Sequence, residues 1–312
     1  MSLVEQKTQL FCKLYRQHTE DAFEEALMQV RNAHLMDESE LSVILQQAVI
    51  DAESEWLDEP HAELEGMSPR GFVASLEDEK DLLDFIQTSA LHLDDSLPLE
   101  LASVLRERGG IVEPQLIEWA VAGHRIDFDG SERMPKELLL AIRATDLLSS
   151  WRVPLAQTRL LDGYIELDNP APIWSEAIQA YLEAQGKQAV EPMIDLLNRE
   201  HEKAFTDTIR RRRDTEDYLL IALTSIGQDA PDEEIYQMIR RSFRETEPRL
   251  IPVICLGDYG DARAVTMLRH YLIREAHMTD EATYYEIIST IQRLGGTTDD
   301  LPDPFTPDAL KR

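Results

Sequence analysis

Histidine, cysteine and carboxylate side chains are the groups that could hold a metal or act as nucleophiles in this 312-residue chain. A zinc site needs such ligands closely spaced on one element, as two histidines four apart or a Cys-x-x-Cys pair. The eight histidines do not have that spacing, and Cys12 and Cys255 each stand alone in an apolar run. The sequence also has no Gly-x-Ser-x-Gly elbow and no Walker-type loop. It therefore predicts no catalytic residue, no metal and no cofactor.

The most concentrated cluster of cations is the run Arg210, Arg211, Arg212 and Arg213, which has acidic residues on both sides. Four consecutive residues of a helix sweep about 300° around its axis, so they cannot form a single stripe. One interpretation is a solvated helix end with local ion pairs. The other is a partner-binding anchor, either for an acidic peptide or for the acidic N-terminal block of the protein itself.

A second candidate for partner binding lies between Trp56 and Leu76. The segment Trp56-Leu57-Asp58-Glu59-Pro60-His61 is followed by Leu64, Gly66, Ser68-Pro69 and Leu76. It is similar to the Trp, Pro-Asn, Leu-Gly-Gly, Thr-Pro phrase at the C-terminal, toxin-binding end of some bacterial antitoxins, with His61 in place of the usual Asn and Glu65 in place of the first Gly. The resemblance implies partner binding by Trp56, His61 and Arg70.

Two features of this segment can be interpreted without the resemblance. A partly exposed Trp56 would suit a binding anchor. Ser68-Pro69 is the clearest helix start in the chain, since serine caps free N–H groups and proline at the first helical position loses no hydrogen bond. The alternative interpretation is therefore a tight turn that leads into a capped helix.

The charge of the chain restricts its partners. With 60 acids and 31 bases the net charge is −29, and residues 51–100 alone hold 15 acids and 2 bases. Binding to a nucleic-acid backbone needs clustered Lys and Arg, so we expect a basic protein or peptide as the partner and not a nucleic acid. No apolar stretch is long enough to span a membrane, and we expect a cytoplasmic protein.

A short phrase recurs along the chain: a helical run ends in Leu or Ile, and a glycine follows four residues later. It occurs at Leu105–Gly109, Leu182–Gly186, Leu223–Gly227, Leu256–Gly260 and Ile291–Gly295. The intervals are 77, 41, 33 and 35 residues, so the first spans about two repeats. Periods of this size are typical of helical solenoids, in which stacked helix pairs cover one another's apolar faces. A glycine that ends a helix often adopts positive φ, so we expect each of these to reverse the chain.

The segment Leu256-Gly257-Asp258-Tyr259-Gly260-Asp261-Ala262-Arg263-Ala264-Val265 resembles a bacterial HEAT repeat, and so does the segment 222–227. The resemblance is good for residues 175–296 and weaker for 98–174. It implies an all-α protein, an α-α superhelix of armadillo-like type with an N-terminal helical cap. We expect an acidic helical segment over 1–95, repeats over 96–296 and a flexible tail over 297–312.

Repeat motifs of this kind specify a fold and say little about activity. The leading hypothesis is a non-catalytic scaffold that binds a protein or peptide on the concave face, which the second helix of each pair builds. The alternative is a HEAT-type lyase or other protein-modifying enzyme related to bilin attachment. The sequence leaves the oligomeric state undetermined.

Overall fold

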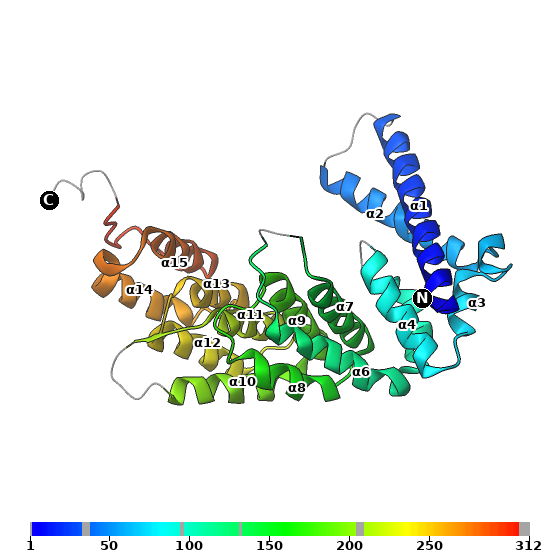
Figure 1. Ribbon diagram of the computed structural model, residues 1–312. Coiled ribbons are helices and arrows are strands. Elements are labelled where there is room, and N and C mark those ends of the chain that lie inside the picture. Colours follow the sequence, from blue (N-terminus) through cyan, green and yellow to red (C-terminus); the bar gives the residue numbers. More distant parts are fainter. Residues whose placement is uncertain (1, 33–37, 94–96, 131–132, 204–208, 306–312) are drawn as a thin grey trace. The chain divides into compact units, whose positions relative to one another are not determined.

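The computed structural model describes residues 2–32, 38–93, 97–130, 133–203 and 209–305 (Figure 1). Within these ranges nearly all regular structure is helical, which confirms the prediction of an all-α protein. None of the helices in these ranges combines the length and hydrophobicity needed to cross a membrane.

The chain divides into two compact units. Unit 1 comprises residues 1–123 and 133–151, and unit 2 comprises residues 124–132 and 152–312. Helices on both sides of residue 95 belong to unit 1, whereas the sequence places a boundary there. The domain limits drawn from the sequence stay predictions.

Unit 1 contains seven α-helices in its described residues. They are α1 (Leu3–Asn32), α2 (Glu38–Asp58), α3 (Pro69–Ala74), α4 (Glu79–His92), α5 (Leu99–Arg106), α6 (Gly109–Ala122) and α7 (Lys136–Trp151). Helix α1 packs on α2 and α4, and α7 packs on α4, α5 and α6. Ser68 caps α3 as predicted, because its Oγ accepts a hydrogen bond from the Gly71 N–H at 3.1 Å.

Unit 2 contains eight α-helices and two short strands in its described residues. They are α8 (Leu155–Tyr164), α9 (Pro172–Gln185), α10 (Lys187–Glu202), β1 (Arg210–Arg211), α11 (Asp214–Asp229), α12 (Glu233–Glu245), β2 (Thr246–Glu247), α13 (Leu250–Tyr259), α14 (Ala264–Glu275) and α15 (Glu281–Arg293). Helices α9, α11, α13 and α15 each contact the next in that order, and α10 contacts α12 (Figure 1). The first helices of successive pairs thus pack on one another, and so do the second helices α10 and α12.

The glycines of the recurring phrase divide into two groups. Three have positive φ at the end of a helix, as predicted: Gly186, Gly260 and Gly295. The predicted chain reversal is wrong at Gly109, the first residue of α6, and at Gly227, which lies within α11. A Cβ on Gly227 would lie 2.5 Å from Cε2 of Tyr259. This glycine therefore allows α11 and α13 to approach closely.

Candidate functional site

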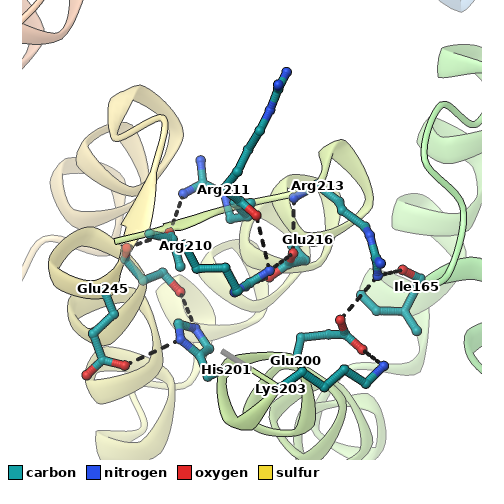
Figure 2. A network of polar contacts seen from close by, with 12 residues as sticks. Ile165, Glu200, His201, Lys203, Arg210, Arg211, Arg213, Glu216 and Glu245 are labelled. Atoms are coloured by element: carbon teal, nitrogen blue, oxygen red, sulfur yellow. Dashed lines mark hydrogen bonds and ion pairs between the residues drawn. The ribbon is translucent and has the colours of Figure 1, made fainter. Parts of the chain in front are cut away.

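The four consecutive arginines lead into the start of α11, where Arg213 is the N-cap residue, but the Arg212 side chain is 0% exposed, so the interpretation as a solvated helix end is wrong for that residue. Arg210 and Arg211 form β1, which pairs in parallel with β2, and Arg213 precedes the first residue of α11. Successive side chains of an extended segment point to opposite sides. Arg210 and Arg212 accordingly face the interior of unit 2, whereas the Arg211 side chain points away from the polar network (Figure 2).

Arg210 forms a two-pronged ion pair with Glu216, whose side chain is fully buried in the first turn of α11. The Glu216 carboxylate also accepts a hydrogen bond from the Arg213 N–H at 3.0 Å, which satisfies one of the free donors at the helix start. Removal of one member would leave the other as an unpaired buried charge, which costs about 3–5 kcal/mol. The pair therefore stabilises the position of β1 against the first turn of α11.

Arg212 is equally enclosed, with a side chain that is 0% exposed. Its Nε donates to Asp217, and its Nη1 donates to Thr246 Oγ1 at 2.8 Å. Burial raises the pKa of Asp217 even though Arg212 lies beside it. The Arg212 N–H donates to the Glu247 carbonyl at 2.6 Å, so side chain and backbone together join β1 to β2.

Arg213 joins α11 to two earlier segments of unit 2 (Figure 2). Its Nη1 donates to the Ile165 carbonyl and to Glu200, at 3.1 Å in each case. Glu200 also accepts from Lys203 Nζ at 2.6 Å. Three of the four arginines therefore connect segments within unit 2. The predicted local ion pairs are present for Arg210 and Arg212, whereas Arg213 pairs with the more distant Glu200. The binding role predicted for all four stays a prediction, and Arg211 is the member whose side chain is exposed.

Trp56 is 3% exposed, which corrects the expectation of a partly exposed anchor. Its ring contacts those of Phe11, Tyr15 and His61, with the His61 centroid 5.2 Å away. The sequence could not show this burial, because Phe11 and Tyr15 lie on α1, some 40 residues earlier.

The turn after Trp56 is stabilised by a backbone hydrogen bond and by ion pairs of Arg70. The His61 N–H donates to the Met67 carbonyl at 3.0 Å, and Arg70 pairs with Asp58 at 2.8 Å and with Glu100. These contacts are those of a tight turn leading into a capped helix. Partner binding by Trp56, His61 and Arg70 stays a prediction.

A hollow of about 430 Å³ lies along α10, near the start of α12. Its floor consists of the apolar side chains of Val190, Ile194, Ile226 and Ile235, which are at most 8% exposed. Its rim carries one exposed lysine, Lys187, and four exposed carboxylates, those of Glu191, Asp195, Asp232 and Glu234. We refer to this hollow as the α10 groove. Its rim favours positively charged groups, because carboxylates outnumber the lysine.

Sequence reasoning did not identify the α10 groove, although its signal is local in part. Glu191 and Asp195 are four residues apart, as are Val190 and Ile194, so a helix places an acidic stripe beside an apolar one. The contribution of α12 comes from about 40 residues later and depends on how the helix pairs stack.

The two cysteines are unsuited to nucleophilic chemistry. Both are buried, and burial raises the pKa of Cys12 and of Cys255 to about 12, so both stay protonated at neutral pH. The described residues also contain no group of three His, Cys, Asp or Glu side chains placed to hold a metal.

Comparison of the chain with protein-family models, with curated proteins and with solved structures finds no match.

Proposed function

We propose that this protein is a non-catalytic binding module that holds a basic segment of another protein or peptide in the α10 groove. The observation that supports the proposal most directly is the groove itself, with an apolar floor under a rim of four carboxylates and one lysine. A lysine or arginine side chain matches both parts, because its methylene stem can lie on apolar surface while its charged head meets a carboxylate.

The arrangement of unit 2 supports a HEAT-like stack as the scaffold for this site. Helices α9, α11, α13 and α15 form one row of successive contacts, and α10 packs on α12 as a second row. The groove runs along α10, the second helix of its pair, which is where the interaction hypothesis places the binding face. The superhelix, its concave face and the N-terminal cap belong to this proposal.

The composition of the chain supports a basic partner as well. Most of the excess negative charge lies outside the groove, with 15 acids and 2 bases in residues 51–100. A field of this sign raises the local concentration of a positively charged partner and speeds its association. The groove would then supply the short-range contacts that retain it.

The test is selection of binding sequences from a random library of displayed octapeptides, followed by affinity measurement with the selected peptides. We expect peptides rich in Lys and Arg to be enriched. The double variant Glu191→Lys/Asp195→Lys should bind them at least tenfold more weakly, because reversal replaces two attractions by repulsions worth up to about 1 kcal/mol each.

The matched control is Asp162→Lys/Glu166→Lys, which changes two exposed acids with the same spacing and alters the net charge equally. It should retain affinity within about threefold, since neither residue lines the α10 groove. Equal weakening by both variants would show that bulk charge, and not the groove, is responsible. Absence of enriched basic peptides would contradict the proposal outright.

A further inference from the structure

We infer that unit 2 carries a second binding site, around Arg211, that takes a peptide with a carboxylate side chain next to an apolar one. The site is a hollow of about 430 Å³ at the loops between successive helix pairs. It is lined by β1, by the segment that follows β2, and by the segment between α14 and α15. No residue of the α10 groove contributes to it.

Arg211 supplies the charge for this site. Its side chain is exposed, and Glu247, which lies opposite it in the β1–β2 pair, forms its ion pair with Arg249. Figure 2 shows it directed away from the network that occupies its neighbours. Strand alternation causes this separation, because β1 turns Arg210 inward and Arg211 outward.

The other charged groups of the hollow are already engaged. Glu247 pairs with Arg249 at 2.6 Å, and Asp280 accepts a hydrogen bond from the Thr283 N–H at 2.9 Å as the cap of α15. The formal charges of the hollow therefore balance, with two guanidiniums and two carboxylates, but Arg211 is the member for which the described residues show no ion pair. A ligand carboxylate is the group that could form a charge-assisted pair with it.

Arg249 gives the hollow a rigid wall. Its side chain is 12% exposed, its Nε donates to the Phe243 carbonyl at 3.0 Å, and its guanidinium lies 5.0 Å from the centroid of the Tyr271 ring. The Tyr271 hydroxyl accepts hydrogen bonds from Arg249 at 3.3 Å and from Thr279 at 3.1 Å. Polar groups held in this way lose little freedom when a ligand arrives.

Exposed apolar side chains at the rim of the hollow indicate that the ligand has an apolar group beside its carboxylate. Ile209 is 51% exposed and Met278 is 76% exposed, and both line the hollow. An aliphatic residue next to the carboxylate would cover this surface, which favours a peptide over a small carboxylic acid. The inferred ligand is thus an acidic and aliphatic peptide segment.

The experiment uses the full chain and the same random octapeptide library, with selection now scored for sequences that carry Asp or Glu beside Leu, Ile, Val or Met. We expect such peptides to be enriched and to bind Arg211→Ala about tenfold more weakly. Arg199→Ala is the control, because Arg199 is an exposed arginine on α10 that lines neither hollow. Met278→Ser should weaken binding by a smaller factor.

Several results would overturn the inference. They are a library without enriched acidic and aliphatic peptides, unchanged affinity in Arg211→Ala, and equal weakening in Arg211→Ala and Arg199→Ala. Free glutamate that binds as tightly as the peptides would show that a small carboxylate suffices, and this too would contradict the peptide assignment. Binding of basic peptides is measured separately, so the two sites can fail independently.

Discussion

His201 shows how strongly the interior of unit 2 affects a single side chain. Its side chain is 2% exposed, and its two ring nitrogens lie 3.5 Å from Ser242 Oγ and from a Glu245 carboxylate oxygen. Burial lowers the pKa of His201 to about 4, and the nearby positive charges of Arg241 and Arg210 act in the same direction. The imidazole is therefore neutral in the folded protein at neutral pH.

This shift makes the stability of the protein depend on pH. An unfolded histidine, with a pKa of about 6.5, binds protons that the folded one does not, so the free energy of unfolding rises with pH between about 4 and 6.5. The burial of neutral His201 therefore leaves the free energy of unfolding at its full value above pH 6.5 and lowers it progressively as the pH falls toward 4. We expect His201→Gln to reduce the difference in unfolding free energy between pH 7.5 and pH 5 by about 2 kcal/mol.

Urea denaturation at the two pH values measures this difference. His277→Gln serves as the control, because His277 is exposed and its replacement should leave the dependence on pH as it is in the parent protein. A dependence in His201→Gln equal to that of the parent would show that His201 titrates normally in the folded state.

The arginine run shows what could be inferred at this scale from the sequence. Local ion pairs were predictable, because Glu216 and Asp217 follow within a few residues. The separation into buried and exposed members was not, since it depends on an extended backbone at residues 210–211. That conformation is held by β2, whose residues pair with β1 from 36 positions further along the chain.

The crossing of α11 and α13 depends on a position without a side chain. Gly227 of α11 faces the ring of Tyr259, the last residue of α13. The Tyr259 hydroxyl donates to the Asp232 carbonyl at 2.7 Å and accepts from the Asp232 N–H at 2.8 Å. Two hydrogen bonds thus hold the Tyr259 ring in the space that the Cβ of an alanine at position 227 would occupy.

Gly227→Ala tests this account of the crossing. In an unhindered helix the change stabilises by up to about 1 kcal/mol, but here overpacking should dominate and lower the free energy of unfolding by about 1–3 kcal/mol. The control is Gly110→Ala in α6, where a new Cβ would have nothing within 4 Å and we expect no loss of stability. Urea denaturation of both variants gives the comparison, and equal effects would mean that the Tyr259 ring moves without cost.

The ends of individual helices could largely be predicted from the sequence, whereas the way in which the helices pack on one another could not. The start of α3 follows from Ser68-Pro69 and the end of α9 from Gly186, because capping and positive φ are properties of a few adjacent residues. By contrast, the recurring phrase predicts a chain reversal at Gly227, and this prediction is wrong. The same spacing occurs where a glycine ends a helix and where a glycine lets a neighbouring ring pack against the helix. At Gly227 the neighbouring ring is that of Tyr259, which belongs to the next helix pair and so cannot be recognised from the local sequence.

For the whole molecule the dominant property is the net charge of −29. It acts on both proposed sites, with opposite consequences. A basic peptide approaching the α10 groove is attracted by the overall field and by the rim carboxylates. An acidic peptide approaching Arg211 is repelled by the overall field and attracted only by nearby cations.

The two association rates should therefore respond to salt in opposite directions. Raising the ionic strength from about 0.01 M to 0.15 M shortens the Debye length from about 30 Å to about 8 Å, which screens the overall field more than contacts made within a hollow. We expect the association rate of a selected basic peptide to fall by at least tenfold and that of a selected acidic peptide to rise. Stopped-flow fluorescence with labelled peptides measures both rates. If both fell together, the cations around Arg211 would outweigh the field of the whole chain, and the acidic block at residues 51–100 would have no part in selecting between the two kinds of partner.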